Sequence, residues 1–376
     1  MLSNQRDQFD IPNEVVYLNC ASQSPLLNSV CRAGEEGVLR KAHPWTDFRS
    51  EAADNAERTR GLFAQLIGAT ADDVAIVPAT SYGISVAARN LPLTAGQRVV
   101  TLDNQFPSNF HAWRVSAEDA DAEFHQVARP DDGDWTNAVL AAIDDNTAVV
   151  ALPPCHWTDG SALNLEAIGE RCRAIGAAFV IDATQAAGAA PIDVARLQPD
   201  FLVSSAYKWL LCPYTLAFLY AAPHRQTGRP IEFHEWAVSG MENRASDRDP
   251  TATAIGARRY DMGERNNPIN LMMATTALQQ LIDWTPAGVA ETIKPLTDRV
   301  ATAARDRGYA VPPDAHRVAH YIGMRMPNGL PDRADERLAE KNIHISLRGD
   351  SLRVSPHIFN TAEDIDRLFA ELDRIT

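Results

Sequence analysis

The chain has 376 residues, of which 45% are hydrophobic and 22% are charged, with 20 glycines and 23 prolines. This composition excludes collagen-like, coiled-coil and extensively disordered chains. The 35 Lys and Arg residues against 49 Asp and Glu residues leave a net charge of −14, and the densest basic pair, Arg258-Arg259, stands close to Asp261 and Glu264. Such a charge repels phosphate backbones and anionic membranes, so we expect no nucleic-acid or membrane partner.

The N-terminal residues and the cysteines indicate a cytoplasmic protein. The first residues lack the apolar core of a secretory signal, and the longest apolar run, at 209–222, contains Pro213 and is too short to cross a bilayer. Five cysteines without a CxxC pair are typical of free, buried thiols in a reducing compartment: Cys20, Cys31, Cys155, Cys172 and Cys212. The ten histidines show no metal-binding spacing, so no metal site is expected.

Short apolar runs alternate with helical periodicity over the first part of the chain. Runs that are near-continuous in apolar residues are typical of strands covered on both faces, and they predict strands at 73–77, 98–102, 148–152, 178–182, 200–204 and 216–220. The segment 79–83 opens a helix after the first of these strands, and 164–176 has helical spacing with Asn164 as N-cap and Gly176 as the stop. This alternation predicts an α/β fold with a mostly parallel sheet.

The pattern changes after residue 220. Residues 223–265 are rich in Pro, Gly, Arg and Asp and predict a long excursion over the surface. A helical stretch follows at about 268–307 and is interrupted by Pro286 and Gly288. From about residue 310 the pattern predicts a small α+β unit, which ends in a helix that begins near Thr361.

An acid and a lysine follow neighbouring predicted strands in the most informative part of the sequence. Asp182 ends the strand at 178–182, and Lys208 stands 26 residues later, just after the next strand. In open α/β sheets the ligand crevice lies beyond the carboxyl ends of the strands, so both side chains can face one pocket. A Schiff-base cofactor such as pyridoxal phosphate (PLP) needs a lysine amine and a carboxylate for its ring nitrogen. The alternative is a surface lysine and an aspartate that caps a helix.

The two segments that contain these residues resemble the cofactor site of a known family. Asp182-Ala-Thr-Gln185, followed by Ser204-Ser-Ala-Tyr-Lys208-Trp, resembles class V aminotransferases, which include cysteine desulfurases, kynureninases and isopenicillin N epimerase. The resemblance extends from 17–22 to 360–361. It implies a fold-type-I PLP-dependent transferase and a homodimer, with an N-terminal segment at 1–20, a large PLP-binding α/β domain at 21–265, and a connecting helix with a small C-terminal α+β domain at 266–376.

The resemblance assigns the groups that would hold the cofactor. Lys208 would form the Schiff base, Asp182 would pair with the pyridinium nitrogen, and Gln185 would bond the phenolic oxygen. Ser205 and Tyr207 match positions that contact the phosphate.

Further cofactor contacts are expected from three other parts of the chain. Thr80 and Ser81 would bind the phosphate at a helix N-terminus, where backbone amides favour an anion. Phe106 would stack on the pyridine ring, its alternative being a core phenylalanine. Arg265 matches a segment donated across the dimer interface to the phosphate, although this chain has Gly263-Glu264 where relatives often have Gly-Thr.

The substrate side of the site is expected on the C-terminal unit. Arg353 would clamp the α-carboxylate of an amino acid substrate, because a planar guanidinium suits a bidentate carboxylate contact. Its alternative is a surface arginine on a strand. The roles of Arg348, His156 and His357 stay open between cleft contacts and structural positions.

The reaction is predicted from what the family chemistry requires. Elimination, transamination and epimerisation all begin with removal of the Cα proton by the freed lysine. Cysteine desulfurases carry a nucleophilic cysteine shortly before the carboxylate-binding arginine, and no cysteine follows Cys212 here. We therefore expect a lyase that eliminates a β-substituent without a persulfide. An aminotransferase or an epimerase is the alternative within the class, and a non-catalytic binding protein of this fold is the alternative from another class.

Overall fold

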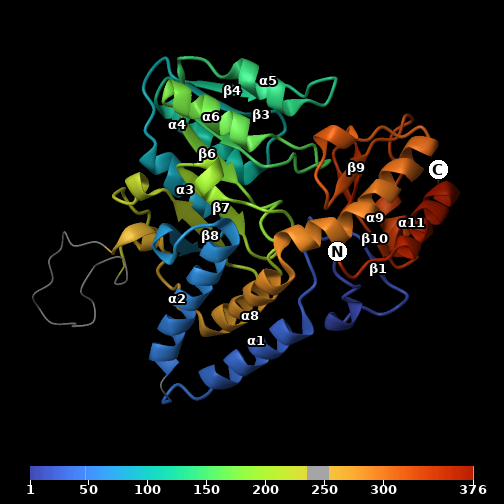
Figure 1. The fold of residues 1–376 in the computed structure, drawn as a ribbon, viewed down its shortest axis with the longest axis horizontal. Coiled ribbons are helices and arrows are strands. Elements are labelled where there is room, and N and C mark those ends of the chain that lie inside the picture. Colours follow the sequence, from blue (N-terminus) through green and yellow to red (C-terminus); the bar gives the residue numbers. More distant parts are fainter. Residues whose placement is uncertain (47, 235–253, 376) are drawn as a thin grey trace, which may run out of the picture.

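A seven-stranded sheet organises the larger part of the molecule. The computed structural model describes residues 1–46, 48–234 and 254–375 (Figure 1). The strands lie in the order β2-β8-β7-β6-β5-β3-β4, and every neighbouring pair is parallel except β2–β8 and β7–β8. Their bounds are β2 (Val74–Val77), β3 (Arg98–Leu102), β4 (Glu123–Val127), β5 (Thr147–Leu152), β6 (Ala178–Asp182), β7 (Phe201–Ser205) and β8 (Ala217–Ala221).

The six strands predicted from apolar runs are all confirmed, each to within one residue at either end. The prediction missed β4, whose sequence Glu-Phe-His-Gln-Val lacks a continuous apolar run. This strand lies at the edge of the sheet and pairs only with β3, and only the last of its five residues is buried. The other strands are covered on both faces, and this burial requires the near-continuous apolar runs from which they were predicted.

Helices cover both faces of the sheet, as strand–helix alternation requires. One face packs on α3 (Thr80–Asn90) and α4 (His111–Asp119). The opposite face packs on helices from several parts of the chain, namely α2 (Phe48–Ile67), α5 (Trp135–Ala142) and α6 (Leu165–Ile175), with the short α7 (Val194–Leu197) alongside. The predicted ends of α6 are confirmed, because Asn164 Oδ1 accepts from Ala167 N and Gly176 has a φ of 77°.

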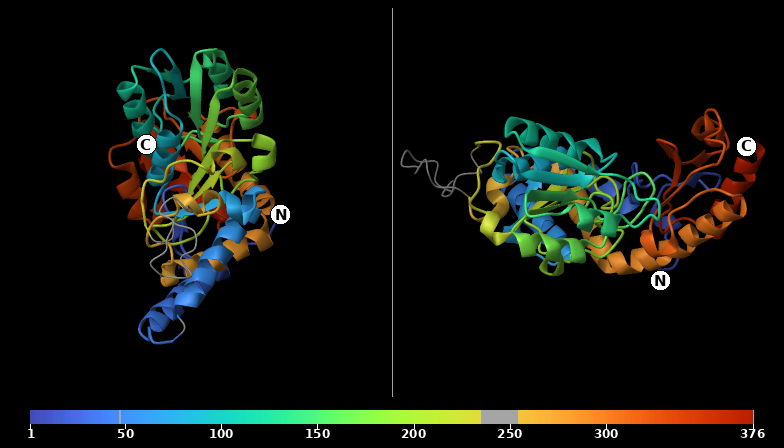
Figure 2. Two further views of the ribbon diagram at one scale, coloured as in Figure 1. Left: turned by 90° about the vertical axis from the view of Figure 1, so that its left-hand side faces the viewer. Right: turned by 90° about the horizontal axis from the view of Figure 1, so that it is seen from above.

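Two long helices connect the sheet to the C-terminal unit. Helix α8 (Pro268–Trp284) packs against α1 (Asn28–Lys41) and α2, and α9 (Pro286–Asp306) continues toward the C-terminal unit (Figure 1). The predicted interruption is confirmed at Thr285, whose hydroxyl caps Gly288 N while Pro286 occupies the first position of α9. The C-terminal unit therefore projects from one end of the molecule (Figure 2).

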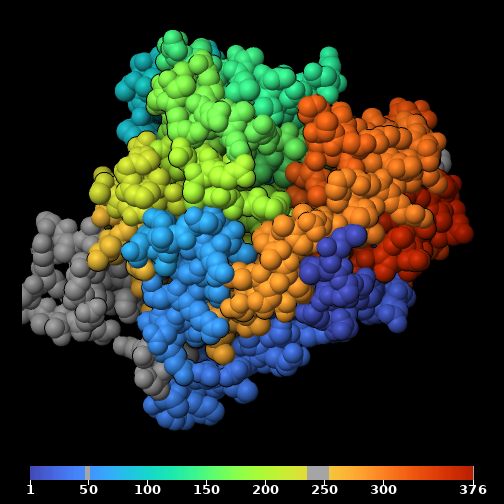
Figure 3. All heavy atoms as spheres, viewed as in Figure 1, coloured from blue at the N-terminus to red at the C-terminus, as the bar shows by residue number. Residues whose placement is uncertain are grey.

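The C-terminal unit combines a small sheet with two helices. Strands β9 (Ile322–Met324), β11 (Ser346–Arg348) and β12 (Ser351–Val354) form an antiparallel sheet in the order β11-β12-β9, and α10 (Ala334–Ala339) and α11 (Ala362–Ile375) accompany it. The predicted start of the last helix near Thr361 is confirmed. Strand β1 (Val16–Tyr17) pairs in parallel with β10 (Ile343–His344), so the N-terminal segment lies against this unit (Figure 3).

The structure also bears on the expected surface excursion, the cysteines and the possibility of a membrane-spanning helix. The excursion at 223–265 lies partly outside the described residues, which omit 235–253. All five cysteines are free, but Cys31 is exposed, because it lies on the outer side of α1 rather than in the core as expected. Within the described ranges, none of the helices combines the length and apolar character needed to cross a membrane. The boundaries at 20 and 265 stay a prediction.

Candidate active site

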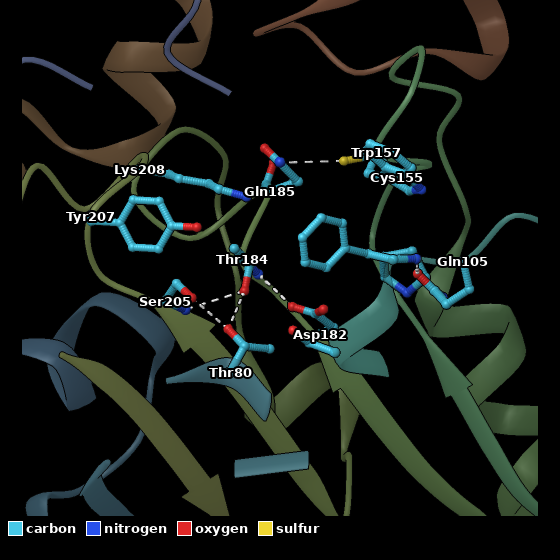
Figure 4. Close-up of a pocket in the computed structure, with 13 residues that line it drawn as sticks. Thr80, Gln105, Cys155, Trp157, Asp182, Thr184, Gln185, Ser205, Tyr207 and Lys208 are labelled. Atoms are coloured by element: carbon cyan, nitrogen blue, oxygen red, sulfur yellow. Dashed lines mark hydrogen bonds between the residues drawn. The ribbon is translucent and has the colours of Figure 1, made fainter. Parts of the chain in front are cut away.

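A cavity opens where the carboxyl ends of β5, β6 and β7 meet the N-terminus of α3. It contains about 480 Å³ of space free of protein atoms, part of which is continuous with solvent, and Figure 4 shows the side chains that line it. Seven of the residues expected to hold the cofactor line it, namely Lys208, Asp182, Gln185, Thr80, Phe106, Ser205 and Tyr207. The described part of the chain therefore brings together these side chains from four separate segments at the sheet edge where ligand crevices form.

Lys208 is a buried amine at this cavity. It follows β7 and is only 6% exposed, and its Nζ lies 5.2 Å from the centre of the Phe106 ring and 5.5 Å from that of Tyr207. Burial, together with the positive charge of Arg353, lowers the pKa of Lys208 to about 8, against a smaller opposing effect of Asp182. A large fraction of this amine is therefore neutral near pH 8, as a nucleophile or general base requires.

Asp182 is a buried carboxylate that lacks a cationic partner at ion-pair distance among the described residues. It is the last residue of β6, and Oδ1 accepts a hydrogen bond of 3.1 Å from Thr184 N. Burial raises the pKa of this carboxyl, while the Thr184 hydrogen bonds and the charge of Lys208 oppose the rise. A carboxylate held beside a cavity in this way retains acceptor capacity for a ligand N–H group.

Three hydroxyl groups gather below the cavity at the N-terminus of α3. Thr80 Oγ1 lies 2.9 Å from Thr184 Oγ1 and 2.6 Å from Ser205 Oγ, and Ser205 N donates to Thr184 Oγ1 at 3.2 Å (Figure 4). The first amides of a helix have no intrahelical acceptor and carry a partial positive charge, so together with these hydroxyls they form a cradle for an anion. Ser81 is exposed and lies in a neighbouring groove rather than in the cavity.

The side chain of Gln185 is oriented by two hydrogen bonds. Its Nε2 donates to Ala21 O at 2.9 Å, and its Oε1 accepts from Trp209 Nε1 at 2.9 Å. An amide nitrogen has two N–H groups, so one of them is left for a ligand in the cavity. This arrangement is compatible with the predicted contact to an oxygen of the cofactor.

The aromatic rings of Phe106, Trp157 and Tyr207 form part of the cavity wall. The Phe106 and Trp157 rings meet edge to face with centroids 5.4 Å apart. Tyr207 stacks on Tyr214 at 4.1 Å, which holds the ring immediately before Lys208 in place. The Phe106 ring thus borders a cavity, where a flat ligand can stack on it.

Arg353, which is expected to bind a substrate carboxylate, is almost fully buried. Its Nη1 donates to Trp157 O at 2.7 Å and its Nη2 to Ser22 Oγ at 2.9 Å, while its Nε has no partner. No described Asp or Glu forms an ion pair with it, and burial together with the charge of Arg348 lowers its pKa to about 10. A buried guanidinium that lacks a carboxylate can donate hydrogen bonds to an anionic ligand.

Other expected positions lie outside the cavity. Arg265 Nε is 3.1 Å from the buried carboxylate of Asp261, which also pairs with Arg60, and Arg265 is not among the residues that line this cavity. His156 stacks on Trp135, and burial lowers its pKa. The ring of His357 stacks near Trp209 and Phe359, and burial lowers its pKa to about 3. Both imidazoles are thus neutral parts of the core. Of the two roles that the sequence left open for these histidines, the structure supports the structural one.

Three residues at the site were not singled out from the sequence. Thr184 lies inside the Asp182–Gln185 segment and was readable as a hydroxyl beside the carboxylate. Trp157 follows His156, whose role the sequence left open, and its ring lines the cavity. Ser22 ends the first segment that carried the family resemblance, but only the tertiary structure shows its contact with Arg353. Among the described residues, no three His, Cys, Asp or Glu side chains gather as a metal site would require.

Comparison with known proteins identifies the family of the chain. The family model for aminotransferase class-V matches residues 16–368. The chain is 27% identical to the uncharacterized aminotransferase YcbU of Bacillus subtilis (strain 168), over 94% of this chain and 93% of that protein. It is 25% identical to isopenicillin N epimerase of Streptomyces clavuligerus, over 96% of this chain and 95% of the epimerase.

A solved structure shares the fold. The chain superposes on a variant of C-DES that carries glycine linked covalently to its PLP cofactor, with a TM-score of 0.89 and 18% identity, covering 99% of this chain and 100% of the other. At this identity the likeness concerns the fold. The family match, by contrast, extends over most of the sequence, and the chain belongs to the class-V aminotransferase family of PLP-dependent enzymes.

Proposed function

We propose that this enzyme removes the Cα proton of an α-amino acid and then eliminates a substituent from Cβ. The observation that carries the proposal is the buried Lys208 amine, whose pKa is lowered to about 8, in one cavity with the carboxylate of Asp182. The positive charge of Arg353 acts on the same amine, so a carboxylate-binding group lies near the reacting lysine.

The residues of the cavity fit PLP. Asp182 has acceptor capacity for the protonated ring nitrogen, and Phe106 borders the space a flat ring would take. The hydroxyls of Thr80 and Ser205 and the first amides of α3 suit a phosphate. Gln185 keeps one N–H group for the phenolic oxygen. We therefore assign these residues to PLP, with Lys208 as the Schiff-base lysine.

The protein groups divide the chemical work at Cα. When bound, PLP supplies an electron sink for the electron pair that is left at Cα. Arg353 would hold the substrate α-carboxylate and so fix which Cα bond faces Lys208. Lys208 Nζ would take the Cα proton, which its lowered pKa permits near neutral pH. Asp182 would keep the proton on the ring nitrogen, because its carboxylate has no other cationic partner among the described side chains.

Elimination is favoured over a persulfide mechanism by the state of the thiol at the cavity. Cys155 lines the cavity, but burial raises its pKa to about 12, and its Sγ donates to Gln185 O at 3.6 Å. A thiol in this state is not a nucleophile near neutral pH. Elimination needs no thiol, since the β-substituent leaves with its own electron pair once Lys208 has taken the Cα proton.

Transamination is the second candidate, and the same lysine supports it. Lys208 can return the proton to a different carbon without a second base, and YcbU, a relative over most of this chain, is named an aminotransferase. The two reactions differ in stoichiometry. Elimination releases ammonia and a keto acid from one substrate, whereas transamination turns over only with a second keto acid.

The first experiment measures cofactor binding. Purified protein supplied with PLP is expected to gain the yellow colour of a lysine-bound cofactor, and Lys208→Ala is expected to stay colourless. The exposed lysine of the Lys294–Asp298 pair provides a matched control, Lys294→Ala, which should be as yellow as the parent. A colourless parent, even with excess PLP, would contradict the proposal.

The second experiment distinguishes the reactions. Amino acids with a leaving group at Cβ are supplied alone, and ammonia, keto acid and the released group are measured. Continuous release of all three supports elimination. Turnover that begins only when a second keto acid is added would favour transamination, and recovery of the substrate with inverted configuration would favour epimerisation.

A further inference from the structure

Two arginines of the C-terminal unit project from the same face of one hairpin. Strands β11 and β12 are joined by a two-residue turn at Gly349-Asp350, where Gly349 has a φ of 60°. In this register Arg348 lies opposite Ser351, and Arg353 lies opposite Ser346. Residues directly opposite each other share a face, as do alternate residues of one strand, so the two arginines are diagonal neighbours on one face.

Both guanidinium groups converge on one serine hydroxyl. Arg348 Nη2 donates to Ser22 Oγ at 2.5 Å, and Arg353 Nη2 donates to the same oxygen at 2.9 Å. A hydroxyl oxygen has two lone pairs and can accept both bonds, but it carries no charge to offset two cations. The fold thus holds two like charges together, an arrangement that is unfavourable unless an anion joins them.

The described residues supply no acid to this pair. Arg348 is half-buried, and its other contact is Nη1 with the backbone carbonyl of Leu347 at 2.9 Å. Other arginines of the C-terminal part do have carboxylate partners, such as Arg299 with Asp366 and Arg307 with Asp373. In a chain with 49 acidic residues, the lack of a partner at Arg348 and Arg353 marks a site that is open to an anion.

The pair lies close enough to the cavity to act on its chemistry. Arg353 donates to Trp157 O, and Trp157 lines the cavity. The charges of Arg353 and Arg348 both lower the pKa of Lys208. The α-carboxylate of a substrate neutralises one guanidinium only, so the second remains available to the rest of the same molecule.

We propose that Arg348 is a specificity-determining residue that binds a second acidic group, so that the preferred substrate is an α-amino acid with an acidic side chain. The α-amino acid part rests on the proposed function, whereas the binding of two acidic groups rests on the hairpin alone. Ser22 holds the two guanidiniums in place until the dianion binds. A guanidinium and a carboxylate form a directional, charge-assisted pair, which discriminates strongly against a neutral amide.

The test measures the binding of dicarboxylates by calorimetry on the PLP-loaded protein. Succinate and butyrate have the same chain length but carry two and one carboxylates. Succinate is expected to bind at least about tenfold more tightly, and Arg348→Gln is expected to reduce that ratio to about twofold or less. Arg325→Gln removes the same charge from the neighbouring strand end, where Arg325 faces Asp350, and should keep the preference of the parent.

The outcomes separate this inference from the proposed function. Equal binding of succinate and butyrate by the parent, or a preference that survives Arg348→Gln, would overturn the role of Arg348. A further outcome is that the protein fails to bind PLP and still prefers succinate, with that preference lost in Arg348→Gln. Such a result would support the dianion site and reject only the proposed reaction. Circular dichroism of Arg348→Gln checks that the hairpin variant is folded, and unchanged butyrate binding shows that Arg353 is still in place.

Discussion

Lys208 shows how burial prepares a residue for chemistry. Its amine is almost fully enclosed, and desolvation disfavours the ammonium form more than Asp182 favours it. The positive charges of Arg353 and Arg348 act in the same direction. Protonation of Lys208 therefore costs free energy in the folded protein. Such a cost is the usual sign of a functional rather than a stabilising residue.

This cost predicts a pH dependence of stability in the cofactor-free protein. Folded Lys208 loses its proton near pH 8, whereas the unfolded side chain does so near 10.5, so the unfolded chain binds more protons in this interval. The contribution of Lys208 therefore becomes more favourable as the pH rises from 8 to 10.5. Lys208→Met should be more stable than the parent below pH 8, by about 3 kcal/mol at most, and this advantage should shrink over the interval.

The measurement is denaturant unfolding at a series of pH values. Lys294→Met is the matched control, because Lys294 is exposed and its ion pair with Asp298 involves no buried amine. Its stability difference from the parent should be small over the same interval. An advantage of Lys208→Met that stays constant from pH 7 to 11 would show that packing, and not the buried charge, causes it.

At the scale of elements, the position of α3 on the sheet decides the geometry of the anion cradle. Gly83 lies in the first turn of α3, and a Cβ atom there would come within 2.6 Å of Val203 Cγ1 on β7. The absence of a side chain therefore allows the helix N-terminus to approach β7, the strand that ends in Ser205. Thr80 and Ser205 can then share a hydrogen bond across the two elements.

Gly83→Ala is expected to displace α3 and weaken PLP binding. Overpacking of this kind costs about 1–3 kcal/mol of folding stability, and PLP retention after dialysis should fall with it. Gly61→Ala on α2 is the matched control, since a Cβ there meets no atom within 4 Å. That variant should gain about 0.5–1 kcal/mol from helix propensity and retain PLP. Equal PLP retention in both variants would show that the approach of α3 does not position the phosphate site.

At the scale of the whole molecule, the site is assembled from both ends of the chain. Ser355 N donates to Leu18 O, Cys20 N donates to Ser355 O, and Ser22 contacts Arg353. Like Ser81, Arg265 is absent from the cavity of a single chain, because it lies beside Asp261. We propose that the active unit is a homodimer in which Arg265 serves the phosphate site of its partner.

Subunit mixing tests this arrangement. Lys208→Ala and Arg265→Met are each expected to be inactive or nearly so, the second because phosphate binding is weakened. If Arg265 acts across the interface, each mixed dimer has one site with both native residues. Random exchange of equal amounts should then restore about a quarter of the parent activity. Recovery should be absent if Arg265 acts on its own chain, and a monomer in sedimentation experiments would contradict the dimer itself.

The local features of the fold were predictable because each depends on a short stretch of sequence. Buried strands appear as apolar runs, as in β6, and caps such as Asn164 are chemical signals for a helix start. Strand β4 was missed for the corresponding reason, since most of its side chains are not buried and its sequence contains no apolar run. Asp182 and Lys208 were readable because both follow strands, whose carboxyl ends a parallel sheet brings to one edge.

The sequence by itself therefore determined the class of fold, the family and the lysine–carboxylate core of the site. Only the tertiary structure decided which groups surround that core. It placed Ser81 outside the cavity, Trp157 inside it, and Ser22 between Arg348 and Arg353. The physical reason is separation along the chain: Ser22 and the arginines are more than 300 residues apart, and their convergence follows from the pairing of β1 with β10 and the register of one hairpin.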